Sequence, residues 1–478
     1  MEKKKVLVIA DLGGCPPHMF YKSLAEKFYV YSYVPRPFAL TVGHSQLMEQ
    51  YSVAVLKDTD FLQTVEDYEH PTSIYWADGE FTKSERQVAD DIKRVARLFE
   101  VDAITTNNEL FVVPMAIACE ELGLRGAGSE AAKRSRDKNL MRESFNASGV
   151  AAIKSRRVTT LADFEAGLQE VGLPAILKPS YLASSIGVRK IDGSVDPSQL
   201  FLEVQEQLKN IPVPDSVTFE APFILETFLE GKGDDWYDTD GLGDYVSIEG
   251  LMVDGTYYPL AITDKGGLIP PFIETTQIMP TSLDAEARAI IVDTARKACE
   301  GLGLQWCATH TEIKLMKNRQ AGVIESAARF PGWNVIPQIK TTFGVDAPQL
   351  LVELLCNGQS DLLPNTLLEE PIRSSGNVHL FLSDFRDQLE VDGDETVLLF
   401  DSIEIPEELL VGDTQITSFS SLGKGTELNV NDFFEVLHSV AAVDLISSNA
   451  EDMRRSLLNI RTRSVLKLTP KKEKEAQR

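Results

Sequence analysis

Two stretches near the middle of the chain, ATHTEIKL at residues 308–315 and VIESAARFPGWN at residues 323–334, decide the fold and the chemistry. Their pattern predicts two antiparallel strands joined by a turn in MKNRQAG. If that turn centres on Asn318 and Arg319, Glu312 and Glu325 face each other on one side of the ladder. Two carboxylates about 5 Å apart repel each other by about 3 kcal/mol at an effective dielectric of about 20.

This repulsion needs a compensating charge, and a hard divalent cation with oxygen ligands supplies it. Glu312 and Glu325 are therefore candidate metal ligands. The alternative is a turn placed one residue differently, which leaves one glutamate in solvent. His310 and Lys314 share the same face of a regular strand, although a lone strand histidine is more often structural than a ligand.

Arg329 follows Glu325 by four residues, and Gly332 and Trp333 come shortly after it. An arginine beside a bound metal can hold a carboxylate or a phosphate through two parallel hydrogen bonds. The alternatives are an ordinary surface arginine and a tryptophan that only anchors packing.

Two lysines earlier in the chain are candidates to bind an anion. Lys178 ends the apolar run of AILKPSYLASSIGV at residues 175–188, and Lys138 lies in the first turn of a predicted helix. A lysine directed into the protein needs an anion, and the phosphates of ATP would serve. For either lysine alone, a surface side chain with a buried stem and a solvated ammonium group is the commoner arrangement.

The net charge of −25 argues against binding to nucleic acid or to anionic membrane surfaces. ATP remains compatible if a few cations gather locally. The apolar run that begins at Val6 is too short for a secretory segment or a membrane span. The five cysteines are widely spaced without a Cys-x-x-Cys pair, so we expect neither a disulfide framework nor a cysteine zinc site, and a cytoplasmic location.

Four regions follow from the alternation of strand and helix patterns, and the fold class is α/β with α+β subdomains. This alternation predicts a parallel α/β domain at residues 1–130. It predicts a small separate subdomain at residues 131–225. Residues 226–360 contain the metal strands, and residues 361–478 form a strand-rich region with a charged tail. In the first region, TTNNEL places Glu109 at the carboxyl end of a parallel strand, where function usually lies.

Taken in chain order, the motifs resemble the ATP-grasp superfamily over about residues 1–360. These motifs are Asp137-Lys138, Lys178-Pro179, the small-residue loop 183–187, ETFL at 226–229, and the two glutamates 312 and 325. The resemblance implies an N-terminal parallel α/β domain, a lid subdomain and a C-terminal antiparallel-sheet domain. It also implies that ATP binds between subdomains together with two Mg²⁺ ions.

The same resemblance assigns nucleotide and metal contacts. The implied nucleotide-binding residues are Lys138, Lys178, Ser184, Ser185, Glu226, Thr227, Phe228 and Leu229. The implied metal ligands are Glu312 and Glu325. Many members carry an asparagine two residues after the second glutamate as a further ligand, whereas this chain has Ala327, so waters or phosphate oxygens must complete the metal shell.

The Glu-x-Ala-Ala-Arg form at residues 325–329 resembles the branch that ligates L-amino acids. That branch joins two L-amino acids into an α-dipeptide through an aminoacyl-phosphate, with Arg329 as the catalytic residue. The implied substrate residues are Glu109, Glu274, Gln277, Arg329, Gly332 and Trp333. Gln277 stands where the resemblance would place a histidine, and the nearby GGLIPP is one residue longer, so the amino-acid pair stays open.

The expected partners are small-molecule amino acids, and a homodimer is compatible with the sequence. Two alternatives remain at this stage. One is an ATP-grasp ligase whose substrate is not an amino acid, and the other is a nucleotide sensor that ligates nothing.

Overall fold

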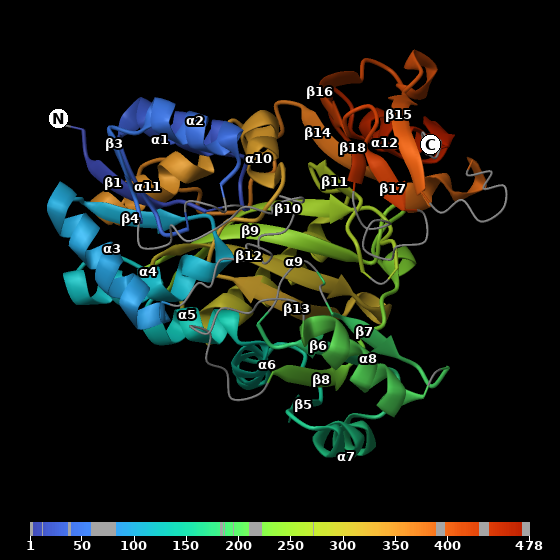
Figure 1. Ribbon diagram of the computed structural model, residues 1–478, viewed down its shortest axis with the longest axis horizontal. Helices are drawn as coiled ribbons and strands as arrows, with labels where there is room; N and C mark the ends of the chain where they lie inside the picture. The colour runs from blue at the N-terminus through green and yellow to red at the C-terminus, as the bar shows by residue number, and fades with distance from the viewer. Residues whose placement is uncertain are drawn as a thin grey trace, which may run out of the picture.

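The computed structural model contains four β-sheets, which together form one continuous body (Figure 1). It describes residues 3–11, 13–36, 40–58, 83–181, 185, 187–194, 196–209, 222–270, 272–388, 397–429 and 439–470. None of the described helices is both long and apolar enough to cross a membrane.

The N-terminal sheet is parallel, as predicted, with the strand order β3-β2-β1-β4. Its helices cover both faces, with α1 and α2 on one side and α3 and α4 on the other (Figure 1). The elements are β1 (Lys5–Ile9), α1 (Pro17–Lys27), β2 (Tyr29–Val34), α2 (Val42–Tyr51), β3 (Ala54–Lys57), α3 (Glu85–Phe99), β4 (Ala103–Thr106) and α4 (Val112–Leu122). A short 3-10 helix, η2 (Glu109–Phe111), places Glu109 directly beyond the carboxyl end of β4.

A second, antiparallel sheet with the order β5-β8-β6-β7 forms the small subdomain. Its elements and the helices that lead into it are α5 (Ser129–Arg136), α6 (Lys138–Ala147), β5 (Ser155–Val158), α7 (Leu161–Val171), β6 (Ala175–Pro179), β7 (Arg189–Ile191), α8 (Pro197–Lys209) and β8 (Phe223–Thr227). Asp137 caps α6, because its side chain accepts a hydrogen bond from the backbone N–H of Asn139. The cap fixes Lys138 as the first residue of the helix.

The central sheet has eight antiparallel strands in the order β13-β12-β9-β10-β11-β14-β18-β16. Its strands and helices are β9 (Tyr245–Val253), β10 (Thr256–Lys265), β11 (Thr276–Met279), α9 (Ala285–Gly301), β12 (Cys307–Leu315), β13 (Ala321–Ala327), α10 (Val335–Phe343), α11 (Ala347–Asn357), β14 (Ser374–Phe381), β16 (Gln415–Ser421) and β18 (Ser439–Ser447). The turn between β9 and β10 has positive φ at both Asp254 and Gly255. Because β11 pairs with β14, this sheet continues past residue 360 into the C-terminal region.

The described residues of the C-terminal region also form a three-stranded antiparallel sheet and an α-helix that packs on β14 and β18. These elements are β15 (Val397–Glu404), β17 (Glu427–Asn429), α12 (Ala450–Arg463) and β19 (Val465–Pro470).

The pairing of β12 with β13 confirms that Glu312 and Glu325 face each other. Nearer the turn, however, Lys314 pairs with Gly322 and Leu315 with Ala321, so the turn centres on Asn318 alone. A register shift next to Glu312 compensates for this one-residue difference. The predicted turn position was therefore wrong by half a residue, and the bulge restores the predicted carboxylate pair.

Gly14 provides a test of the close contact between its own backbone and that of Asn107. Its φ is +80°, and an added Cβ atom would lie 2.5 Å from the backbone oxygen of Asn107, just after β4. Gly14→Ala is therefore expected to lower the free energy of unfolding by about 1–3 kcal/mol, measured by urea denaturation. In the control Gly43→Ala, where an added Cβ meets no atom within 4 Å, stability should stay unchanged or rise by up to about 1 kcal/mol. Equal losses in both variants would contradict the steric explanation.

Candidate active site

A cavity of about 550 Å³ lies between the small subdomain and the central sheet. It brings together most of the site residues predicted from the sequence. Those on its wall are Lys138, Lys178, Ser185, Glu226, Thr227, Phe228, Leu229, Glu274, Gln277, Glu312, Glu325, Arg329, Gly332 and Trp333. Ser184 lies outside the described residues. Glu109 is not on the cavity wall and lies behind Arg329, with which it forms an ion pair.

Lys178 on β6 and Glu226 on β8 are diagonal neighbours on two paired strands, and both are buried. The Lys178 Nζ lies 2.6 Å from one Glu226 oxygen, and Arg142 Nε lies 3.0 Å from the other. Burial lowers the pKa of Lys178, although Glu226 acts against this shift. Burial would raise the pKa of Glu226, but Arg142 and Lys178 hold it below its usual range. Lys178 is thus a buried cation rather than a surface lysine.

Arg142 was not among the predicted site residues. It also donates to the backbone oxygens of Val323 and Ile324, at 3.0 and 3.2 Å, so it fixes β13 next to Glu325. Its position four residues after Lys138 on α6 places both side chains on one face of that helix. This spacing is the signal in the sequence that could have identified it.

Lys138 reaches the cavity from the start of α6, and its Nζ lies 3.4 Å from a Glu325 oxygen. Its backbone N–H donates to the oxygen of Ser180, just before the loop at residues 181–188. Burial would raise the pKa of Glu325, but Lys138 and Lys178 lower it below the usual range. Glu325 is therefore ionised near neutral pH.

Within the described part of this loop, Ser185 contacts Phe272, and both residues line the cavity. Ser185 has a φ of +57°, and its hydroxyl donates to the backbone oxygen of Phe272 at 3.1 Å. On the neighbouring wall, Lys190 Nζ lies 4.4 Å from the centre of the Phe228 ring. The cavity thus has an aromatic wall beside a cation.

The residues at the Glu312–Glu325 pair fit a bound Mg²⁺ ion, because facing carboxylates supply hard oxygen ligands. Within the described ranges, no group of three or more His, Cys, Asp and Glu side chains is placed to hold a metal. Ala327 is buried and offers no ligand. The rest of a metal shell would therefore come from water or phosphate, as the sequence predicts.

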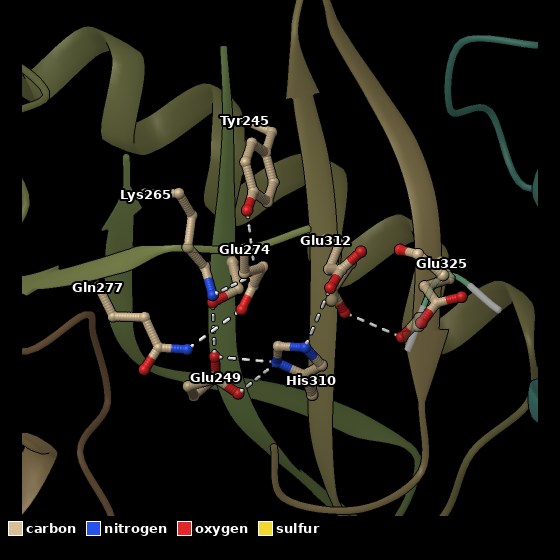
Figure 2. Close-up of polar contacts among 12 residues, drawn as sticks. Tyr245, Glu249, Lys265, Glu274, Gln277, His310, Glu312 and Glu325 are labelled. Atoms are coloured by element: carbon tan, nitrogen blue, oxygen red, sulfur yellow. Dashed lines mark hydrogen bonds and ion pairs between the residues drawn. The ribbon is translucent and has the colours of Figure 1, made fainter. Parts of the chain in front are cut away.

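His310 lies between Glu249 and Glu312 (Figure 2), with its Nδ1 3.0 Å from both Glu249 oxygens and its Nε2 3.6 Å from a Glu312 oxygen. Burial would lower the pKa of His310, but Glu249 and Glu312 raise it to about 10. A protonated imidazole cannot bind a metal. His310 therefore supports Glu312, which agrees with the structural role considered for it from the sequence.

A second carboxylate, Glu274, is the centre of a polar cluster (Figure 2). Lys265 Nζ lies 2.8 Å from it, and the Tyr245 hydroxyl and the Gln277 amide each donate to it at 3.2 Å. Burial would raise the pKa of Glu274, but Lys265 holds it below its usual range. Gln277 is itself fixed, because its side-chain oxygen accepts a hydrogen bond from Asn377 at 3.2 Å. Glu274 is thus an ionised carboxylate in a fixed orientation.

Trp333 is held against the cavity wall by an aromatic stack. Its ring lies 3.8 Å from that of His379 with an interplanar angle of 15°. Burial lowers the pKa of His379 to about 4, so the stack is neutral at pH 7. The φ of Trp333 is +58°, a conformation that few side chains adopt without support. His379 could not be predicted, because only the pairing of β14 with β11 brings it to the site.

Glu109 forms ion pairs with both Arg136 and Arg329, and all three side chains are largely buried. Burial would raise its pKa, but the two guanidinium groups lower it to about 2. Because this pKa lies below the usual 4.5, the contribution of Glu109 to stability is fully present above about pH 4.5. It is lost as the pH falls toward 2.

Glu109→Gln is therefore expected to lower the free energy of unfolding by about 3 kcal/mol at pH 7. Urea denaturation at a series of pH values should show this deficit shrinking below pH 4.5, because the carboxyl group is then protonated in the unfolded wild type, and the deficit should be lost as the folded carboxyl group is protonated near pH 2. The exposed Glu370→Gln serves as the control and should change little at any pH. A deficit that does not vary with pH would contradict the charge-based explanation.

Comparison with known proteins places the chain in a family. Residues 171–336 match a family model described as an ATP-grasp domain. The alanine–anticapsin ligase of Bacillus subtilis is 55% identical over 98% of this chain and 99% of its own length. That of Bacillus amyloliquefaciens is 54% identical over the same shares.

The fold comparison agrees with the sequence comparison. The crystal structure of an L-amino acid ligase from Bacillus licheniformis matches 98% of this chain and 99% of its own, with a TM-score of 0.71 and 20% identity. The ATP-grasp fold expected from the order of the motifs is confirmed. The chain belongs to the family of ATP-grasp ligases that includes the alanine–anticapsin ligases.

Proposed function

We propose that this protein is an ATP-dependent ligase that joins two L-amino acids into an α-dipeptide through an aminoacyl-phosphate. The observation that carries this proposal is the cavity itself. Its lining includes the buried Lys178, the largely buried Lys138 and two facing carboxylates, and Arg329, which also lines it, forms an ion pair with Glu109. Phosphoryl transfer to a carboxylate needs this combination of charges.

The substrate pair that the relatives support is L-alanine and L-anticapsin, whose product is the dipeptide antibiotic bacilysin. This choice rests on identity of 54–55% over nearly the full length of the alanine–anticapsin ligases. The five cysteines form no disulfide, which suits a reducing compartment, so we place the enzyme in the cytoplasm.

Lys138 and Lys178 are proposed to bind the ATP phosphates, and residues 226–229 the remainder of the nucleotide. Glu312 and Glu325 are proposed to hold two Mg²⁺ ions, which would neutralise charge on the phosphates when bound. The carboxylate of the first amino acid attacks the γ-phosphorus and ADP leaves. Arg329 donates hydrogen bonds to the phosphoryl oxygens as negative charge builds up on them.

The amine of the second amino acid then attacks the carbonyl carbon of the aminoacyl-phosphate. The amide bond forms as the bond to the phosphate oxygen breaks, and inorganic phosphate leaves. Glu274 is proposed to orient a substrate ammonium group, because it is ionised and reaches the cavity. Gly332 and Trp333 are proposed to shape the wall beside the acyl group, and the loop at residues 181–188 to exclude water.

The two alternatives account for less of the site. A nucleotide sensor needs no arginine at the phosphoryl group, yet Arg329 lines the cavity between the carboxylate pair and Trp333. A ligase for other carboxylates would use the same nucleotide residues, but it would not require the fixed, ionised Glu274 in the cavity.

The direct test is to mix the protein with ATP, Mg²⁺, L-alanine and L-anticapsin and to measure phosphate release and dipeptide by mass spectrometry. We expect one phosphate per dipeptide. A panel of other L-amino acids, tested in each of the two substrate positions, shows which side chains the pocket accepts. Phosphate release that depends on a carboxylate other than an amino acid would favour the alternative ligase, whose substrate is not an amino acid. ATP binding without turnover would favour the nucleotide sensor.

The proposed metal ligands make a separate prediction. Glu312→Gln and Glu325→Gln each remove one charged oxygen ligand, so dipeptide formation should fall by about 10²-fold or more. Raising Mg²⁺ should recover part of the activity of each single variant and none of that of the double variant. Glu370→Gln, which changes an exposed glutamate, should match wild type. Wild-type Mg²⁺ dependence in both single variants would exclude these residues as ligands.

A further inference from the structure

Four residues, three of them buried and one partly exposed, form a continuous chain of contacts between the start of the loop at 181–188 and the cavity. Tyr181 follows β6, Arg136 ends α5, Glu109 begins η2, and Arg329 follows β13. They lie far apart in the sequence and come from three of the four predicted regions. Their meeting point is the carboxylate of Glu109.

Arg136 connects the loop to this carboxylate. Its guanidinium lies 4.0 Å from the centre of the Tyr181 ring, and its Nη2 donates to the Tyr181 backbone oxygen at 3.3 Å. The Tyr181 hydroxyl in turn donates to Glu85 at 3.1 Å. Nη1 of Arg136 donates to Glu109, so the same guanidinium holds both the loop and the carboxylate.

Glu109 in turn fixes the orientation of Arg329. Its second oxygen pairs with Nε of Arg329, whose Nη1 donates to the backbone oxygen of Phe330 at 2.9 Å. These contacts leave Nη2 of Arg329 without a partner among the described residues. The guanidinium of Arg329 is thus held on two sides, while Nη2 stays available to donate a hydrogen bond. Such a group does not have to reorient when negative charge develops on a phosphoryl group beside it.

We propose that Arg136 and Glu109 are positioning residues that hold Arg329 ready for phosphoryl transfer and tie it to the loop that starts at Tyr181. This inference rests on the proposed ligase function. It differs from the role that the family resemblance implies for Glu109, which is direct contact with an amino-acid substrate. The observation behind the difference is that Glu109 lies behind Arg329 and off the cavity wall.

Steady-state kinetics separate the two roles, using Arg136→Met, Arg136→Lys and Glu109→Gln. If these residues position Arg329, kcat should fall by about 10²-fold in Arg136→Met and Glu109→Gln, and less in Arg136→Lys, which keeps the charge. The KM for each amino acid and the Kd for ATP should change less than about threefold. Urea denaturation confirms that each variant is folded under the assay conditions.

Arg125→Met is the matched control. Arg125 donates to the backbone oxygens of Leu355 and Cys356 and stacks on Trp306, with no contact to Arg329. This variant should lose stability and keep its kcat. A KM for one amino acid that rises about tenfold or more in Glu109→Gln with kcat retained would overturn the proposal, because Glu109 would then bind substrate. An unchanged kcat in Arg136→Met would overturn it as well.

A second readout does not depend on the substrates. In ¹⁵N spectra of the ligand-free protein, the Nε–H signal of Arg329 is identified by its loss in Arg329→Lys. Exchange of this proton with water should be slow in wild type and in Arg125→Met, and at least about tenfold faster in Arg136→Met. Equal exchange in Arg136→Met would overturn the proposal. If wild type makes no dipeptide, the proposed function fails, and this measurement alone decides whether Arg136 positions Arg329.

Discussion

The facing pair of Glu312 and Glu325 is the constraint on which the site depends. Two like charges on one face of a sheet are unfavourable unless cations surround them. The structure supplies Lys138 beside Glu325 and a protonated His310 beside Glu312. In the proposed function, the Mg²⁺ that comes with ATP would supply the remaining positive charge. The antiparallel pair is thus stable in the free protein, and it is poised to bind a cation together with a polyanion.

The cations of the cavity contrast with the composition of the chain. A protein with a net charge of −25 repels ATP at long range, yet its cavity wall collects five lysine and arginine side chains, the protonated His310 and four carboxylates. The lysine and arginine side chains are those of Lys138, Lys178, Lys265, Lys314 and Arg329. Each has a carboxylate partner in the ligand-free protein, so their burial is compensated before any nucleotide binds.

The sequence predicted the parts of the site that lie on local patterns. The register of Glu312 against Glu325 follows from strand alternation, and the capped start of α6 places Lys138. Apart from Arg142, whose spacing from Lys138 is a local signal, the residues it missed depend on tertiary packing. Lys265 and Tyr245 reach Glu274 only through the order of the central sheet, and His379 arrives from a strand more than forty residues beyond Trp333. A local pattern carries no signal for such long-range neighbours, just as it carries none for the bulge beside Glu312.

The ion pairs in the ligand-free cavity also determine which contacts must be shared or broken when ATP phosphates bind. Glu226 holds Lys178 at 2.6 Å, and Glu325 holds Lys138 at 3.4 Å. For either lysine to reach a phosphate, it must share or leave its carboxylate. The longer Lys138–Glu325 pair requires less energy to separate, and a metal at Glu325 would compensate the carboxylate that Lys138 leaves. Lys178 lacks that compensation, but Arg142 remains on Glu226 and keeps its charge paired. When a lysine moves from its carboxylate to a phosphate, the carboxylate therefore keeps a second cation. That cation is Arg142 for Glu226 and the proposed metal for Glu325, so no buried charge is left unpaired.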